Sequence, residues 1–242
     1  MNIKKFLLSP ISKTKRFLEI VNDFVVFKGQ NDNRFSVSWR NRNLQLNDAV
    51  KTQSNGGHYL YHPAWALRII LKNNPPKHVD ISSILFFPAM LSASLPVEYY
   101  DYRPAKVTLT NLISKGANLL KLPFKCNSIQ SLSCMHTIEH IGLGRYGDEI
   151  DPEGDIKAIT ELKRVLKKGG DLLIVVPVGI PTIYFNAHRV YSYEQIIGYF
   201  SDLKLMEFSM LPDNTSKGLI KNPNLKTVKK QKYACGCFWF RK

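Results

Sequence analysis

The chain has 242 residues, of which 44% are hydrophobic and 11% aromatic, and its formal net charge is +15. This composition is sufficient to bury a full core and excludes an intrinsically disordered protein. The four cysteines show no metal-finger spacing, so we interpret them as core thiols in a reducing compartment. No apolar run approaches the roughly 18 residues of a membrane span, and the charged N-terminus lacks a signal-peptide cleavage pattern. A cytoplasmic protein is therefore expected.

The excess of positive charge favours anionic partners such as nucleic acid, a membrane surface or a phosphorylated substrate. The lysines are spread along the chain, apart from a cluster over residues 217–232. This segment has no interleaved aromatic residues of the kind that stack on bases, so no specific nucleic-acid site is expected. Two interpretations of the cluster stay open: a solvated loop, and a peripheral contact with phosphate or an anionic membrane surface.

Residues 1–57 predict an accessory segment that packs on or over a larger domain of residues 58–242. Within it, residues 14–22 favour a short helix and Phe24–Phe27 a strand. The weak alternation of apolar residues over 34–46 is typical of a hairpin. The segment is a candidate for substrate specificity.

In the larger domain, strand and helix patterns alternate along the chain. Helices are predicted from about 63 to 73, from 151 to 168 before the pair Gly169-Gly170, and from 192 to 200. Strands are predicted over 78–81, 97–102, 117–120, 129–135, 172–176, 204–210 and 233–240, with a connection over 106–116. The Ser192-x-x-Gln195 pattern is typical of a capping box. This alternation predicts a doubly wound, mostly parallel α/β sheet with a terminal antiparallel strand.

Residues 131–180 form the most informative stretch of the domain. A buried strand is followed by a polar, glycine-rich loop, an amphipathic helix and a second buried strand. His136, Glu139 and His140 come just past the carboxyl end of the first strand. Because open α/β sheets bind ligands outside the carboxyl ends of their strands, we expect a ligand site at this loop.

Several segments of this chain resemble the class I S-adenosylmethionine-dependent methyltransferases, over roughly residues 57–242. The segments KHVDISS and EYYDYRP look like the first and second strands of that family, and ELKRVLKKGGDLLIVVPVG resembles its fifth-strand region. Within the superfamily, GGHYLYHPAW, HTIEHIGLGRYGDEIDPEGD and FNAHRVYS look like a bacterial methyltransferase-like family of unknown function. The resemblance implies a Rossmann-like methyltransferase fold and S-adenosylmethionine as cofactor.

The resemblance also implies cofactor-binding positions. Asp101, at the end of the second strand, would accept hydrogen bonds from ribose hydroxyls. Asn118 would meet the adenine amine through its carbonyl oxygen. The remaining cofactor-side candidates are Asp80, Ser82 and Ser83, beside the methionine part, and His136, at the mouth of the site.

The first loop departs from the family pattern. The family has a glycine-rich D-x-G-x-G-x-G loop, because the backbone passes close to the cofactor there. Here the sequence reads DISSILFFPAML, without a glycine between Asp80 and Leu95. Two hypotheses therefore stay open: a methyltransferase that binds its cofactor unusually, and a non-catalytic binding or scaffold protein on the same fold.

On the acceptor side, His136, His140 and His188 are candidate catalytic residues, since an imidazole near neutral pH can accept a proton. Candidate substrate-binding residues are Arg145, Asp148, Asn186 and Arg189. An arginine fork suits carboxylate or phosphate, although aspartates in this loop are also typical caps and turn formers. The predicted activity is methyl transfer to a small-molecule or glycan-type acceptor, phosphorylated or nucleotide-linked, and the resemblance suggests surface-polysaccharide biosynthesis.

The segment His136-Thr-Ile-Glu139-His140 also matches H-x-x-E-H, the inverted zinc-protease motif. Such a motif belongs in a long helix, whereas Gly142 and Gly144 follow directly and no third ligand is evident. The main interpretation therefore contains no metal, and a zinc hydrolase is kept as an alternative.

Overall fold

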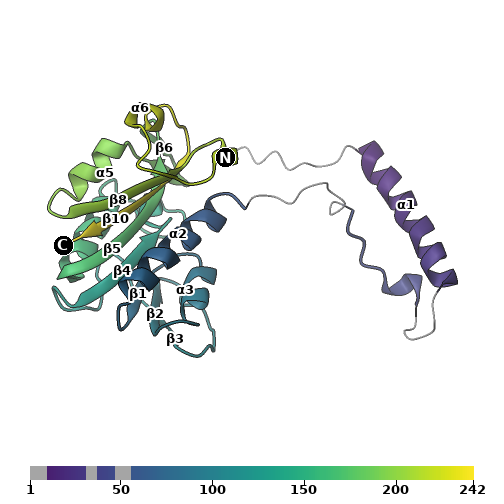
Figure 1. The fold of residues 1–242 in the computed structure, drawn as a ribbon, viewed down its shortest axis with the longest axis horizontal. Helices are drawn as coiled ribbons and strands as arrows, with labels where there is room; N and C mark the ends of the chain where they lie inside the picture. The colour runs from purple at the N-terminus through teal and green to yellow at the C-terminus, as the bar shows by residue number, and fades with distance from the viewer. Residues whose placement is uncertain (1–9, 31–36, 47–55) are drawn as a thin grey trace. The chain divides into compact units, whose positions relative to one another are not determined.

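The computed structural model describes residues 10–30, 37–46 and 56–242 (Figure 1). Contacts within the chain divide it into two compact units, Met1–Ser54 and Asn55–Lys242. No helix among the described residues combines the length and the apolar character needed to cross a membrane. An accessory role for residues 1–57 stays a prediction.

In the first unit, helix α1 spans Pro10–Gly29. The strand predicted over Phe24–Phe27 is therefore wrong. Helical hydrogen bonding continues through this apolar run, and the amide of Gln30 still donates to the carbonyl of Val26 at 3.2 Å. The strand propensity of four residues is a weak preference, which the continuing helix overrides.

The hairpin predicted over residues 34–46 is also wrong where the structure describes it. Residues 37–46 contain only a short 3-10 helix, Trp39–Asn41, and residues 34–36 lie outside the described part. The hydroxyl of Ser38 accepts from the amide of Arg40 at 3.3 Å, which closes a turn instead of a strand pair. The ring of Phe24 packs edge-on against Trp39, with 5.0 Å between the centroids.

In the second unit, one eight-stranded sheet has the order β3-β2-β1-β4-β5-β10-β8-β9 (Figure 1). Its strands are β1 (His78–Ile81), β2 (Val97–Asp101), β3 (Leu112–Gly116), β4 (Ile129–Met135), β5 (Leu166–Val178), β8 (Lys204–Leu211), β9 (Ile220–Lys221) and β10 (Ala234–Arg241). The strands from β3 to β5 are parallel, and β10 lies antiparallel between β5 and β8. This confirms the predicted mostly parallel α/β sheet with a terminal antiparallel strand.

The sheet separates two hydrophobic cores, as the alternation along β5 shows. Leu172, Ile174 and Val176 pack in the core that contains residues of α4 (Gly154–Val165) and α5 (Tyr193–Tyr199). Leu173 and Val175 pack in the other core, with residues of α2 (His58–Asn73) and α3 (Phe86–Leu91). Successive side chains of a strand point to opposite faces, so a strand covered on both sides is apolar throughout.

The predicted position of the third strand is wrong. The predicted connection over 106–116 contains β3, and the predicted strand over 117–120 is a turn closed by the Asn118–Lys121 bridge. The side chain of Asn118 accepts from the amide of Leu120 at 2.9 Å, which favours the turn. The strand therefore ends at Gly116, paired with Asp101 at the end of β2.

Helix α4 begins at Gly154 and ends at Val165, before the predicted glycine stop. Its continuation is extended, because Leu166 already pairs with Ile129 of β4. The capping box at α5 is confirmed: Ser192 and Gln195 each accept a hydrogen bond from the backbone amide of the other. The hairpin of β6 (Thr182–Tyr184) and β7 (His188–Val190) and the short helix α6 (Leu225–Val228) were not predicted.

Candidate functional site

Two strands end in the same unusual backbone conformation at the carboxyl edge of the sheet. Ser82 follows β1 with a φ of 56°, and His136 follows β4 with a φ of 55°. Residues other than glycine rarely adopt positive φ, and such strain of about 1–2 kcal/mol clusters at functional sites. Ser82 therefore adopts the backbone conformation of a glycine, the residue that the methyltransferases resembled by this sequence have in their first loop. Phe86 and Phe87, which follow it, lie in helix α3, where Phe87 is buried and Phe86 exposed.

Asp80 anchors this turn from inside the protein. Its carboxylate is fully buried and accepts from the Ser83 amide at 3.1 Å, from the Ser83 hydroxyl at 2.6 Å, and from the Ser133 hydroxyl. The Ser83 oxygen in turn accepts from the amide of Met135 at 3.1 Å, so it links the ends of β1 and β4. The ring of His78 continues the network to Ser133 at 2.9 Å. Asp80 and Ser83 thus hold the ends of β1 and β4 together. Their side chains bond to other residues of the protein, and their predicted role in cofactor binding stays a prediction.

Burial raises the pKa of Asp80 from 3.8 to about 6, although hydrogen bonds from Ser133 and Ser83 oppose the shift. Since the folded chain then binds a proton more readily than the unfolded chain, this group contributes less to stability as the pH rises from about 4 to 6. We expect the free energy of unfolding of the wild type to fall across this window by on the order of 2–3 kcal/mol relative to Asp80→Asn. Urea unfolding at several pH values measures this difference; a pH-independent difference would contradict the raised pKa.

Asp101 and Asn118 lie side by side at the same edge of the sheet. Asp101 ends β2, and its carbonyl accepts from the amide of Ala117 at 3.0 Å, which brings Asn118 next to it. The Asp101 carboxylate accepts from the Arg103 amide at 2.7 Å and from the Tyr99 hydroxyl at 3.2 Å. Each oxygen therefore accepts one bond there and keeps a lone pair for a ligand hydroxyl.

His136, Glu139 and Cys235 form a buried row across the loop after β4. Nδ1 of His136 lies 2.8 Å from Oε1 of Glu139, and Nε2 lies 3.6 Å from Sγ of Cys235 on β10. Burial alone lowers the pKa of His136, but its hydrogen bonds with Cys235 and Glu139 outweigh burial and raise the pKa to about 10. In the same way, contact with His136 keeps the pKa of Glu139 below its usual value against the effect of burial.

The other two histidines of the acceptor side lie around the carbonyl of Ala187. Nδ1 of His140 lies 2.5 Å from this oxygen, and a guanidinium nitrogen of Arg145 donates to it at 3.1 Å. The ring of His188 is 6.4 Å from that of His140. Burial lowers the pKa of both His140 and His188, so both imidazoles are neutral near pH 7 and can accept a proton.

The predicted substrate-binding residues divide into two kinds. Asp148 organises the loop, since it accepts from the amides of Gly142 at 2.8 Å, Gly144 at 3.3 Å and Tyr146 at 3.1 Å. Arg189 is buried and donates to the carbonyls of Ile141 at 2.6 Å and Pro152 at 3.2 Å. Arg145 and Asn186 are exposed, Asp148 is half-buried, and Arg189 is buried but lines the second of the cavities described below.

Residues of α2 complete this region and were missed by the sequence reasoning. The ring of His58 stacks between those of His136, at 5.2 Å, and Tyr233, at 5.1 Å. His62 is fully buried, with its ring 5.1 Å from that of His136. The H-x-x-x-H spacing, which places both side chains on one helical face, was the available signal.

The H-x-x-E-H interpretation does not match the geometry. His136 precedes a three-residue 3-10 helix, Ile138–His140, rather than lying on a long helix with His140. His136 faces Cys235, whereas His140 faces the Ala187 carbonyl. Among the described residues, the group with metal-ligand distances consists of His58, His136 and Cys235.

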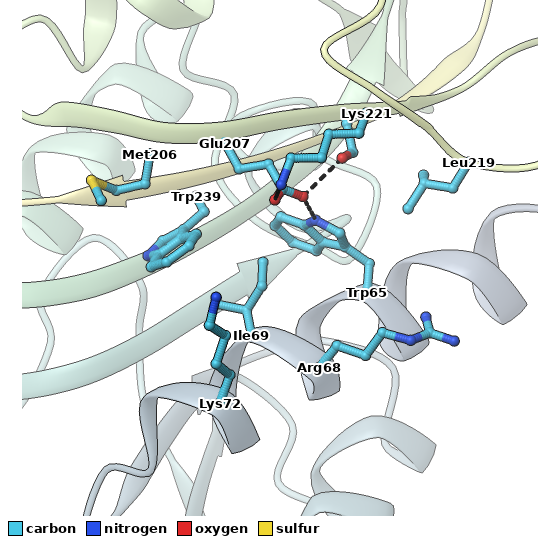
Figure 2. A pocket seen from close by; sticks show the side chains of 10 residues that line it. Trp65, Arg68, Ile69, Lys72, Met206, Glu207, Leu219, Lys221 and Trp239 are labelled. Atoms are coloured by element: carbon cyan, nitrogen blue, oxygen red, sulfur yellow. Dashed lines mark hydrogen bonds and ion pairs between the residues drawn. The ribbon is translucent and has the colours of Figure 1, made fainter.

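Two cavities lie away from the predicted cofactor residues. The first, of about 340 Å³, lies between α2 and the strands β8 to β10 (Figure 2). Trp65 donates to Glu207 there at 2.9 Å, and Lys221 pairs with the same carboxylate at 2.6 Å. The second, of about 360 Å³, is lined by Arg189, among others. Neither is lined by Asp80, Ser82, Asp101 or Asn118.

Parts of the amino-acid sequence are similar to a known sequence family and to one other protein. Residues 121–232, slightly less than half of the chain, match a family described as "Caenorhabditis protein of unknown function, DUF268". The uncharacterized protein MJ0638 of Methanocaldococcus jannaschii is 35% identical over 60 residues, which are 25% of this chain and 21% of that protein. The aligned segment thus spans about a fifth of that relative. The bacterial character of the family resemblance stays a prediction.

Solved structures bear on the fold. The chain is similar to the BH2331 protein of Bacillus halodurans C-125, described as a candidate methyltransferase, with 13% identity and a TM-score of 0.51 over 74% of this chain and 98% of that one. It is also similar to geranyl diphosphate methyltransferase in complex with SAM, with 13% identity and a TM-score of 0.50 over 74% and 84% of the two chains. The fold is that of the class I methyltransferases.

The same fold also occurs in the cyclase SpnF, with 12% identity and a TM-score of 0.54 over 96% of each chain. At these identities the likeness concerns the fold and leaves the reaction open. The reaction has to be argued from the residues at the carboxyl edge of the sheet.

Proposed function

We propose that this chain is an S-adenosylmethionine-dependent methyltransferase. The observation that carries the proposal is the turn at Ser82, whose backbone adopts the left-handed conformation. This turn lies at the carboxyl edge of the sheet, beside the end of β2 with Asp101 and the following turn with Asn118. A serine with positive φ gives the close backbone approach for which the family uses glycine. Asp101 would bind the ribose hydroxyls and Asn118 the adenine amine, and the backbone at Ser82 would face the methionine part.

When bound, the cofactor supplies an electrophilic methyl group on a sulfonium. The contribution of this chain is mainly alignment, because methyl transfer needs the acceptor atom held in line with the sulfonium. His140 and His188, neutral near pH 7, would take a proton from an acceptor hydroxyl or amine. The loop pinned by Arg189 and Asp148 would hold the acceptor side in place.

We further propose an anionic small-molecule or glycan-type acceptor. The exposed guanidinium of Arg145, which lies over the ring of Tyr146 at 5.1 Å, can bind a carboxylate or phosphate group. The net charge of +15 favours such an acceptor electrostatically. Surface-polysaccharide biosynthesis is the setting that the sequence resemblance suggests, and a membrane contact of residues 217–232 stays a prediction.

Isothermal titration with S-adenosylmethionine tests the proposal. We expect Asp101→Ala to weaken binding at least about tenfold, because it removes the acceptor for the ribose hydroxyls. Asp202→Ala is the matched control. Asp202 is exposed and pairs with Lys163 in the last turn of α4, which leads into the start of β5 and not to the carboxyl ends of the strands. Equal affinity of Asp101→Ala and wild type would refute the ribose assignment.

A second candidate is a non-catalytic binding protein on the same fold. It is favoured by the two cavities, which lie away from the predicted cofactor residues. In the first cavity, Trp65 and Trp239 can stack on a planar ligand, and the cations of Arg68 and Lys72 can pair with a negative charge on it (Figure 2). The same titration separates the candidates: no heat of binding at millimolar S-adenosylmethionine would exclude the methyltransferase.

A further inference from the structure

Three side chains from distant parts of the chain meet beside the carboxyl end of β4. His58 comes from the start of α2, His136 from the turn after β4, and Cys235 from β10. One ligand atom of each lies within 4.8 Å of the other two. With zinc bonds of about 2.3 Å to sulfur and about 2.0 Å to nitrogen, a tetrahedral site places these atoms about 3.5 Å apart. Sγ of Cys235 and Nε2 of His136 are 3.6 Å apart, which matches this separation.

Glu139 prepares His136 for such a role. Its Oε1 lies 2.8 Å from Nδ1 of His136, so the proton on Nδ1 points to the carboxylate, and Nε2, which releases its own proton when it binds a metal, faces Cys235. Histidines that bind zinc commonly donate their other N–H to a carboxylate, which fixes the tautomer and increases the basicity of the ligand. The carboxylate is fully buried, as expected for a partner held in place rather than a surface acid.

A second observation points independently to a missing partner. His62 is fully buried with its ring 5.1 Å from that of His136, and neither of its ring nitrogens has a hydrogen bond of normal geometry among the described residues, although the backbone of His58 lies near. An unpaired buried polar group costs about 1–3 kcal/mol, so its retention beside the cluster indicates a ligand. Sγ of Cys237, 3.8 Å from that of Cys235, is a further donor next to the same position.

We propose that His58, His136 and Cys235 bind a zinc ion, with the fourth position left for His62, Cys237 or a water molecule. Imidazole and thiolate donors select zinc over magnesium and calcium, which prefer oxygen. The ion would join α2 to β10 and to the turn after β4, at the carboxyl edge of the sheet. The metal site does not depend on the methyl-transfer proposal, which assigns proton transfer to His140 and His188; it gives His136 a role as a ligand in place of the predicted role in cofactor binding or catalysis.

The contacts from Cys235 to His136 and from His136 to Glu139 are also those of a nucleophile, its base and an orienting acid. The metal site is favoured because Cys235 is fully buried and because His58 adds a third ligand atom to the same point. A nucleophilic thiol needs access for its substrate, whereas a metal ligand does not. Alkylation in the absence of metal therefore separates the two roles.

Cobalt substitution in the full-length protein tests the proposal. After chelator treatment, we expect one equivalent of Co²⁺ per chain to give a thiolate-to-cobalt charge-transfer band, and Zn²⁺ to displace it. Cys235→Ser should remove at least half of this band, and the double variant Cys235→Ser/Cys237→Ser should abolish it. Cys134→Ser is the matched control, since Cys134 is equally buried but packs on the opposite face of the sheet, and it should leave the band unchanged.

His58→Gln provides a second variant if Cys235→Ser does not fold, because His58 starts α2 and is only partly buried. It should weaken cobalt affinity by more than about tenfold. Three results would overturn the site: no stoichiometric metal in the reconstituted wild type, an unchanged band in Cys235→Ser, or rapid alkylation of Cys235 that saturating Zn²⁺ does not slow. Titration of the same samples with S-adenosylmethionine reports the methyl-transfer proposal separately.

Discussion

Replacing Arg189 with leucine should lower the free energy of unfolding by about 3–5 kcal/mol, because it leaves a buried carboxylate without its cation. Arg189 is 5% exposed, and its Nε lies 3.6 Å from Oδ2 of Asp155, which is 4% exposed. The same guanidinium donates to the carbonyls of Ile141 and Pro152. The substitution therefore also releases the loop between them, which carries Arg145 and Asp148. Urea unfolding monitored by circular dichroism measures the loss.

Arg145→Leu is the control for this prediction. Arg145 also donates to a backbone carbonyl, that of Ala187, but it is exposed and has no buried carboxylate to neutralise. Its replacement should change stability by less than about 0.5 kcal/mol. Equal losses for the two arginine variants would show that burial of the ion pair does not determine the effect.

Phe238→Ala should also cost about 3–5 kcal/mol, as is typical for a fully buried phenylalanine. Phe238 lies on β10, the strand inserted antiparallel between β5 and β8. Its ring stacks on Phe208 with 4.6 Å between the centroids and lies 6.1 Å from Tyr193. Truncation leaves a cavity between the sheet and α5, at a place where the strands on both sides are fixed by hydrogen bonds.

Phe185→Ala is the corresponding control, because Phe185 is 71% exposed in the turn between β6 and β7. We expect its free energy of unfolding to stay within about 0.5 kcal/mol of that of the wild type. A small effect of Phe238→Ala would mean that the site collapses around the missing ring, and that β10 is held mainly by its backbone hydrogen bonds.

The sequence predicts the fold best where local patterns agree with the final packing. The segment from β4 to β5 has a buried strand, an amphipathic helix and a second buried strand, and each pattern is readable within a few residues. Phe24–Phe27 and β3 show the opposite case. The first has strand-forming residues inside a continuing helix, and β3 is recognised only through its pairing with β2.

The candidate site was predictable where it follows from strand order. Asp101 and His136 lie at the carboxyl edge because parallel strands end there, a rule that needs no knowledge of side-chain contacts. Cys235 and His136 are 99 residues apart, and β10 brings them together only through its antiparallel insertion beside β5. No local pattern indicates this contact. Arg189 was predicted to bind the substrate; its guanidinium is buried and donates to a backbone carbonyl of the loop, and a direct contact with a substrate stays a prediction.

The most direct test of the methyltransferase proposal is a crystal structure with S-adenosylhomocysteine. We expect the ribose hydroxyls within about 3 Å of the Asp101 carboxylate and the amino-acid part against the backbone at Ser82. The adenine should lie beside Asn118. Density for the ligand in the cavity lined by Trp65 and Trp239, or no density at saturating concentration, would contradict the methyltransferase proposal.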